Sequence, residues 1–197
     1  MLNDALFYNL YEIIEGEEFM APAAPLEHSS FIVELATTIK LYLRRNNSGY
    51  VFPDDVDVHL PDGNFFKPDL VVVTKENAAI LNRRNAIYGV PDMVVEVLSR
   101  STKKRDLTVK KDAYEKNGVK EYWIVDPLYQ SIDVYILRDG KFQLDGEYTH
   151  YEEDDVEWVH MSEEDKAAVK SEITLSIFPD LTIKLSEIFV WAKDFGY

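Results

Sequence analysis

The chain has 197 residues, of which 46% are hydrophobic and 13% aromatic, so it can form a packed core and is not a disordered protein. The absence of cysteine excludes disulfides, thiolate nucleophiles and cysteine-based zinc sites. A formal charge of −15 argues against a general nucleic-acid coat protein. No apolar run approaches the roughly 18 residues that a membrane span needs, and the N-terminus lacks the basic start and apolar core of a signal peptide. We therefore expect a cytoplasmic protein with no membrane partner.

The first half of the chain predicts a β-hairpin, a long helix and a second hairpin. The first hairpin covers about 11–20 and turns at Glu15–Gly16. Apolar residues recur at helical spacing over 26–45. Alternating residues over 50–60, a Pro-Asp-Gly-Asn turn and the apolar segment 70–73 predict a hairpin whose second strand is central in a sheet.

The second half predicts strands that alternate with helices. Residues 75–90 indicate a short helix and a loop, and 93–99 a buried strand. A helix begins near Ser101 or Thr102 and ends at Asn117, before a glycine. The remaining expected elements are a strand over 119–127, a hairpin over 131–144, and a strand, turn and short helix over 173–189. This order predicts an α/β fold with a central mixed β-sheet flanked by helices and with extra N- and C-terminal β-hairpins.

The length and the lack of a linker predict one domain over residues 1–197. Residues 1–25 form an N-terminal β extension in this scheme. Residues 145–172 form an acidic insertion, because they hold eleven acidic and only two basic residues. We expect that deletion of 152–170 would leave the fold intact.

Glu96 lies in the middle of the apolar strand 93–98. Burial of an ionised carboxylate is unfavourable in free energy unless the carboxylate is paired or holds a metal ion. We therefore expect Glu96 to have a charged partner or a chemical role. Asp92 lies on the same face of the strand but about 13 Å away, which is too far to share one cation with Glu96.

Asp69 is a better partner for Glu96. It follows Pro68 and starts the preceding apolar strand. If the two strands are neighbours, the two side chains lie about 5 Å apart and resist joint ionisation. A divalent cation relieves that repulsion, and Mg²⁺ is commonly held by one or two carboxylates together with substrate phosphates.

The helix after Glu96 supplies a cation. Asp106, Lys110 and Tyr114 lie at four-residue spacing on one helical stripe, whereas Lys111 lies about 100° around the helix and faces elsewhere. A lysine directed into a cleft with carboxylates and a metal ion could orient a water molecule or neutralise charge that develops on a phosphate.

These residues resemble the PD-(D/E)XK, or restriction-endonuclease-like, nuclease superfamily, and in particular its Uma-two family of restriction endonucleases. The segments that carry the resemblance are YEIIEGEEFMAP, PDLVVV, PDMVVEVLSRST, RDLTVKKDAY, GVKEYWIVDP and FPDLTIKLSEIF. They cover nearly the whole chain. The sequence departs from the superfamily motif at Leu98, where the motif has its lysine, and Lys110 is the natural substitute.

The resemblance implies a restriction-endonuclease-like core and hydrolysis of phosphodiester bonds in nucleic acid, with DNA as the expected substrate. It implies Mg²⁺ (or Mn²⁺) held by Asp69, Glu96 and the carbonyl of Val97, with Asp69, Glu96 and Lys110 as the catalytic residues. It also implies a homodimer.

Several further residues have both a functional and a structural interpretation. Glu34, His28, Asp57 and Asp106 are possible accessory groups, but each also fits a helix surface, a cap region or a solvated strand face. The run Lys103, Lys104 and Arg105 suits contacts with nucleic-acid phosphates, or forms a solvated helix start. The same ambiguity applies to Asp69 and Glu96, because structural ion pairs also perturb carboxylates.

Two main functions compete. The first is a Mg-dependent nuclease, and the alternative is a catalytically degenerate nuclease fold that binds nucleic acid or a protein, which Leu98 and the negative charge favour. Hydrolysis of a small phosphorylated molecule ranks last, because the chain has no glycine-rich phosphate loop.

Overall fold

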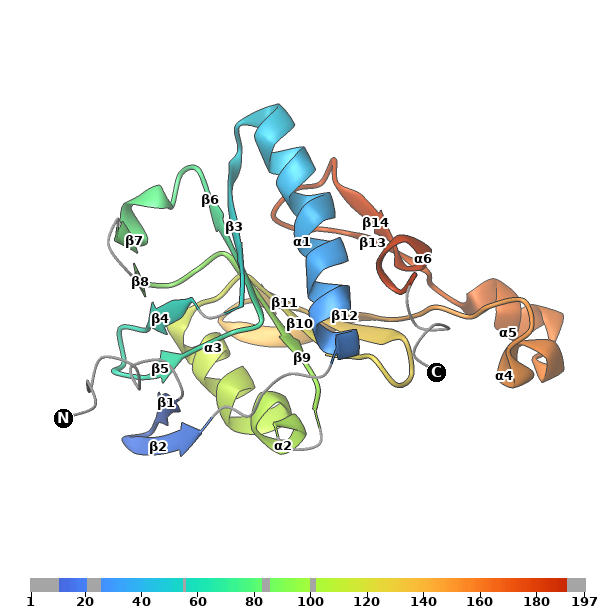
Figure 1. Ribbon diagram of the computed structural model, residues 1–197, viewed down its shortest axis with the longest axis horizontal. Helices are drawn as coiled ribbons and strands as arrows, with labels where there is room; N and C mark the ends of the chain where they lie inside the picture. The colour runs from blue at the N-terminus through green and yellow to red at the C-terminus, as the bar shows by residue number, and fades with distance from the viewer. Residues whose placement is uncertain (1–10, 21–25, 55, 83–85, 100–101, 191–197) are drawn as a thin grey trace.

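The computed structural model describes residues 11–20, 26–54, 56–82, 86–99 and 102–190 (Figure 1). Residue Ser101, one of the two expected helix starts, lies outside these ranges, as do the two ends of the expected N-terminal extension (1–10 and 21–25). None of the helices in the described part combines the length and the apolarity that a bilayer crossing requires.

A central six-stranded sheet forms the core of the molecule. Its strand order is β12-β11-β10-β9-β6-β3. Strands β9 and β10 are parallel and the other neighbours are antiparallel, so the sheet is mixed, as expected. The strands are β3 (Gly49–Pro53), β6 (Leu70–Thr74), β9 (Met93–Val97), β10 (Glu121–Asp126), β11 (Ser131–Arg138) and β12 (Lys141–Thr149).

Helices cover both faces of this sheet, because the central strands are apolar on both faces. Val72 and Val95 belong to a core cluster with α1 (Leu26–Asn46), whereas Val71 and Val94 belong to a second cluster with the helical segment after β9. Figure 1 shows α1 and α3 on either side of β9. This arrangement confirms the predicted fold class.

The helical segment after β9 has three parts. It begins after Thr102, which is one of the two residues near which the sequence predicted the start. It ends at Gly118, which has a φ of 92°. The prediction of one regular helix was wrong in its middle, where a π-helical stretch interrupts the α-helix. The parts are α2 (Lys103–Arg105), the π segment η3 (Asp106–Lys110) and α3 (Lys111–Asn117).

A second sheet of short strands packs beside the central one. Its order is β2-β1-β5-β4-β8-β7, and the N-terminal hairpin joins it where Ile13 pairs with Phe65. Its strands are β1 (Tyr11–Ile14), β2 (Glu17–Met20), β4 (Asp57–His59), β5 (Phe65–Phe66), β7 (Leu81–Asn82) and β8 (Ala86–Tyr88), and the 3-10 turn η2 (Ala78–Ile80) precedes β7.

The second sheet corrects two expectations. The hairpin expected over 50–60 and 70–73 is divided between the sheets, because β3 pairs with β6 whereas β4 pairs with β5. The segment 75–90 contains strands β7 and β8 as well as a short helical turn. These strands have only two or three residues, too few for an alternating pattern to show.

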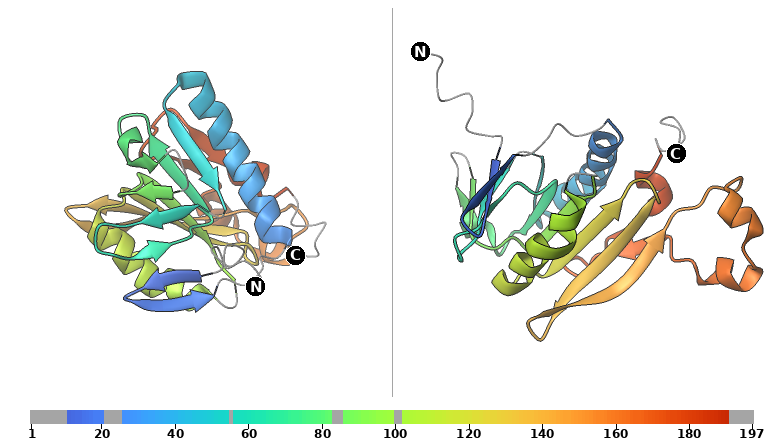
Figure 2. Two further views of the ribbon diagram at one scale, coloured as in Figure 1. Left: turned by 60° about the vertical axis from the view of Figure 1, so that its left-hand side comes forward. Right: turned by 90° about the horizontal axis from the view of Figure 1, so that it is seen from below.

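The C-terminal part begins with residues 150–171, which leave the sheet between β12 and β13 and belong to the acidic insertion predicted from the sequence. We call this segment the acidic excursion. Its helices α4 (Val156–His160) and α5 (Glu163–Ala168) project at one end of the molecule, drawn in orange in Figures 1 and 2. The predicted strand, turn and helix follow as β13 (Glu172–Thr174), β14 (Thr182–Lys184) and α6 (Leu185–Ile188), which pack on the α1 side of the sheet.

Candidate active site

Asp69 and Glu96 come from adjoining strands and lie on the same face of the central sheet. In the β6–β9 ladder Leu70 pairs with Val95, so the next position along places Asp69 opposite Glu96. The backbone N–H of Val97 donates to Oδ2 of Asp69 at 2.6 Å, which joins the two strands at this point. The predicted alignment of the two acids is therefore present.

Lys110 reaches Glu96 from the π segment. Its Nζ lies 3.0 Å from Oε2 of Glu96, 2.9 Å from Oε1 of Glu12 and 3.4 Å from Oδ1 of Asp106. All four side chains are almost fully buried. Asp106 and Lys110 are the first and last residues of the π segment, and Tyr114 follows one turn later in α3.

Both carboxylate oxygens of Glu96 have a partner, since the hydroxyl of Tyr114 donates to Oε1 at 2.8 Å. Burial raises the pKa of Glu96 well above its usual range, and the carboxylates of Asp106, Asp69 and Glu12 add to this effect against the charge of Lys110. Burial alone would lower the pKa of Lys110, but the surrounding carboxylates raise it, so the lysine stays charged. The site thus holds more acids than bases around one buried ammonium group.

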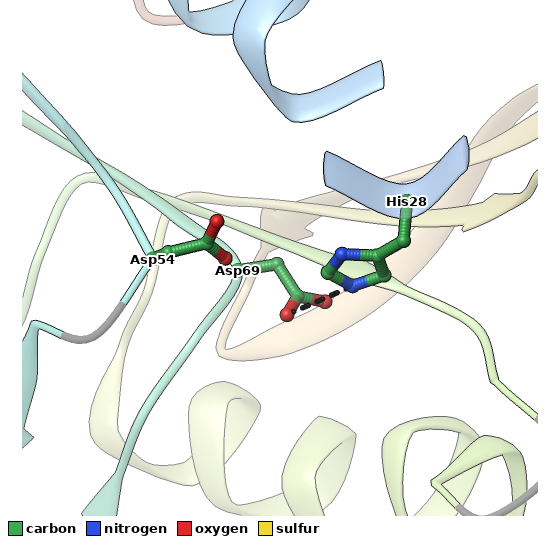
Figure 3. Close-up of side chains that lie close together, drawn as sticks. All are labelled: His28, Asp54 and Asp69. Atoms are coloured by element: carbon green, nitrogen blue, oxygen red, sulfur yellow. Dashed lines mark ion pairs between the residues drawn. The ribbon is translucent and has the colours of Figure 1, made fainter. Parts of the chain in front are cut away.

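A second cluster adjoins Asp69 on the side of α1. Oδ1 of Asp69 lies 3.1 Å from Nε2 of His28, which is in the first turn of α1 (Figure 3). Asp54 follows β3, and its backbone N–H donates to the carbonyl of Asp69 at 2.9 Å. One ligand atom from each of His28, Asp54 and Asp69 lies within 4.8 Å of the others.

His28 responds to this acidic environment. Burial lowers its pKa, but the hydrogen bond to Asp69 and the charges of Asp69, Asp54 and Asp106 outweigh burial, so the pKa of His28 is raised. Its Nδ1 is buried and has no hydrogen-bond partner within the described residues. The imidazole is therefore held through the contact of its Nε2 with Asp69.

The cluster fits a divalent cation in its donor set and its size. Two ligands at roughly 2.0–2.6 Å from one ion are at most about 4–5 Å apart. The 4.8 Å limit of the three ligand atoms falls within that range. In the part of the chain that the structure describes, this is the one group of three or more histidine, aspartate or glutamate residues whose ligand atoms lie this close together. The group does not include Glu96.

The other predicted accessory residues lie outside this cluster. Asp57 pairs with Lys67 on the second sheet at 2.5 Å. Glu34 is half-buried on α1. Asp106 is buried beside Lys110, and burial raises its pKa while the charge of Lys110 opposes the rise.

The three predicted phosphate-binding residues differ from one another in their contacts. Lys103 is exposed and lies 3.1 Å from Asp126. Lys104 is exposed. Arg105 lies 3.8 Å from Glu12, with its guanidinium 5.0 Å from the ring centroid of Phe19. Arg105 thus belongs to the buried network more than to the surface.

Two expectations about excluded residues were confirmed. Asp92 takes no part in the site, because it accepts hydrogen bonds from the Thr74 backbone, Asn77 and Lys120. Lys111 faces away from Glu96 and lies 3.5 Å from the ring centroid of Tyr135.

Sequence reasoning missed two residues of the site, Glu12 and Asp54. Glu12 is on the N-terminal hairpin, and only its place between apolar neighbours distinguishes it from other hairpin residues. Asp54 directly follows Pro53 and has a φ of 34°, and nothing local in the sequence links it to His28. Both depend on long-range packing, which alternation and helical spacing do not report.

The chain belongs to the Uma2 family, whose description is "Putative restriction endonuclease" and whose model matches residues 9–164. The structure resembles the crystal structure of a "putative nuclease belonging to DUF820" from Anabaena variabilis ATCC 29413, with a TM-score of 0.68. The identity is 18%, and the alignment covers 92% of this chain and 90% of the other. The chain has no match among curated proteins. The family and the fold therefore agree with the resemblance seen in the sequence.

Proposed function

We propose that the protein is a metal-dependent nuclease that hydrolyses phosphodiester bonds in DNA. One observation carries the proposal: Asp69, Glu96 and Lys110 lie together on one face of the central sheet. The backbone N–H of Val97 donates to Asp69, and Lys110 donates to Glu96. Two acids from adjoining strands and a nearby ammonium group are a suitable set for phosphoryl hydrolysis. Membership of the Uma2 family supports the same activity.

Asp69 is the centre of the proposed cation site. Its carboxylate lies between the strand that carries Glu96 and the cluster with His28 and Asp54. We propose Asp69, Glu96 and the Val97 carbonyl as ligands of Mg²⁺ or Mn²⁺, with His28 and Asp54 as further ligands on the α1 side. A bound ion would offset charge on the phosphate and lower the pKa of a water molecule.

Lys110 would position the attacking water molecule and stabilise negative charge on the phosphate. Its ammonium group is charged and held within the site, so it costs little reorganisation during the reaction. Asp106, one turn earlier, would orient it. Lys103 and Lys104, exposed at the start of the helical segment, would contact nucleic-acid phosphates, with Arg105 behind them.

The resemblance also leads us to propose a cytoplasmic homodimer in which residues 1–197 act as one domain. The acidic excursion after β12 would repel the nucleic-acid backbone and so favour its approach to the other side of the molecule.

Cleavage of nucleic acid by purified protein tests the proposal. With Mg²⁺ or Mn²⁺ the parent chain should cut DNA, and Asp69→Asn and Glu96→Gln should reduce cutting at least about a hundredfold, since each removes charge at the proposed ion. Asp92→Asn is the matched control, because Asp92 follows a proline as Asp69 does and is buried as Glu96 is, but lies outside the site. Equal cutting by the parent, Asp69→Asn and Glu96→Gln would place the activity elsewhere.

A second candidate is a nuclease fold without catalytic activity that binds nucleic acid or a protein. It is favoured by Leu98 at the usual lysine position and by the occupation of both Glu96 oxygens by Lys110 and Tyr114. Calorimetry separates the two candidates, because this module would bind neither Mg²⁺ nor Mn²⁺ at millimolar concentration.

A further inference from the structure

Glu12 is an acid of the site that comes from neither the central sheet nor the helical segment. It lies on β1 of the second sheet, and its side chain is 4% exposed. Its Oε1 is 2.9 Å from Nζ of Lys110, as close as the proposed catalytic partner Glu96. The N-terminal hairpin therefore supplies part of the site.

Groups other than Glu96 hold Glu12 in place. The backbone N–H of Lys67 donates to Oε1 at 3.1 Å, and the guanidinium of Arg105 lies 3.8 Å from Oε2. Lys67 immediately precedes Pro68 and Asp69, so Glu12 is connected to the strand that carries the proposed cation ligand. Its position would persist if the contacts of Glu96 changed.

The contacts of Glu96 must change if it binds a cation. Both of its oxygens have a partner, Lys110 on Oε2 and Tyr114 on Oε1. A divalent ion next to Glu96 would repel the ammonium group of Lys110 and compete for the same oxygens. Lys110 then needs another anion to stay in the site, because a buried charge without a partner is costly.

Asp106 is less suited to this task than Glu12. It is on the same helical segment as Lys110, four residues earlier, and its oxygen is 3.4 Å from Nζ. It therefore shares any displacement of the segment. Glu12 is on a separate element, and its shorter contact can hold the ammonium group against the rest of the site.

We propose that Glu12 is a positioning residue that keeps the Lys110 ammonium group in the site while Glu96 binds the cation. This inference rests on the proposed nuclease function and adds the N-terminal hairpin to it. Glu12 acts through Lys110 and contacts neither the substrate nor the cation.

Steady-state cleavage kinetics of Glu12→Gln and Glu12→Asp test the inference. Glu12→Gln keeps the shape of the side chain and removes its charge, so kcat should fall about a hundredfold, the loss that a small misplacement of a catalytic group causes. The KM for nucleic acid and the rise in Tm that Mg²⁺ produces should stay as in the parent chain. Glu12→Asp keeps the charge and should recover part of kcat.

The matched control is Glu18→Gln on the same hairpin, where Glu18 pairs with Ile13 in the β1–β2 ladder and is exposed. It should have the parent kcat. If Glu12→Gln does not fold, Glu12→Asp carries the test alone, with an intermediate fall in kcat at constant KM as the supporting result.

Three results would overturn the inference. If the parent chain cuts nucleic acid and folded Glu12→Gln has the parent kcat, the role of Glu12 alone is overturned. The same result in Glu12→Asp has this meaning where only that variant folds. A loss of the Mg²⁺-dependent rise in Tm in these variants would also overturn it, because Glu12 would then affect the cation site itself. No cutting by the parent chain would overturn the proposed function and this inference with it.

Discussion

Nζ of Lys110 lies 3.0 Å from Oε2 of Glu96, and each side chain is only 3% exposed. The pair adjoins a hydrophobic core cluster that includes Val94 and Tyr114. Charges in such a place are tolerated only when they are paired, so Lys110 has a structural effect as well as its proposed catalytic one.

Replacement of Lys110 by Met should therefore destabilise the fold strongly. The change leaves Glu12, Glu96 and Asp106 without their shared cation, and loss of one partner of a buried ion pair costs about 3–5 kcal/mol. Urea denaturation measures the free energy of unfolding. The control Lys111→Met affects a lysine that lies on the ring of Tyr135 and should cost about 1 kcal/mol or less. Equal losses in the two variants would contradict the buried network.

Asp92→Asn should lower stability without lowering the activity of the folded protein. The carboxylate accepts hydrogen bonds from the Thr74 backbone, Asn77 and Lys120, and hydrogen bonds to charged groups contribute about 1.5–3 kcal/mol. Burial alone would raise the pKa of Asp92, but these donors lower it below the usual 3.8.

The lowered pKa sets the pH dependence of this effect. A folded-state pKa below the unfolded value stabilises the protein above about pH 3.8, and the stabilisation is lost as the pH falls through the lower folded-state pKa. The difference in unfolding free energy between the parent and Asp92→Asn should therefore narrow on acidification from pH 7 toward pH 3. A difference that stays constant or widens would show that the carboxylate charge is not responsible.

Asp54→Asn should weaken cation binding at Asp69. At a cation concentration about 100 times Kd, binding stabilises a protein by about 2.7 kcal/mol, which corresponds to a rise in Tm of about 5–10 °C for a chain of this length. Thermal unfolding with and without Mn²⁺ should show this rise in the parent and a much smaller one in Asp54→Asn. Asp57→Asn, which changes an acid paired with Lys67, should keep the full rise. The same rise in both variants would exclude Asp54 as a ligand.

Deletion of residues 152–170, with a short Gly-Ser connection, should leave the fold intact. Helices α4 and α5 contain no buried residue, and Trp158 packs on Tyr151 and Lys166 within the excursion itself. Changes that do not affect the core usually shift stability by about 0.5 kcal/mol or less, so Tm should move by only about 2 °C. Loss of cooperative unfolding in a thermal scan would show that the excursion supports the core.

The sequence predicted those parts of the site that depend on local periodicity. Alternation along two apolar strands placed Asp69 and Glu96 on one face, and helical spacing placed Lys110 toward them. These two inferences use only the period of a strand or a helix and the order of neighbouring elements. The resemblance to the superfamily, whose motif has its lysine where this chain has Leu98, pointed to the same helix.

The rest of the site depends on how distant segments pack. Glu12 reaches Lys110 only because β1 pairs with β5 in a second sheet, and that sheet consists of strands too short to show alternation. Asp54, which has a positive φ, lies near His28 at the start of α1 only because β3 and α1 pack together. The π segment Asp106–Lys110 was also unpredicted, because its residues have no pattern distinct from that of an α-helix.

A crystal structure of the protein soaked in Mn²⁺, with anomalous scattering to locate the ion, tests the central claim most directly. We expect one strong anomalous peak within about 2.0–2.6 Å of a carboxylate oxygen of Asp69, beside His28 and Asp54, with Glu96 released from Lys110 and directed at the ion. An Asp69 carboxylate without a peak at saturating Mn²⁺, with the Lys110–Glu96 pair unchanged, would contradict the claim that these acids form a metal-dependent catalytic site.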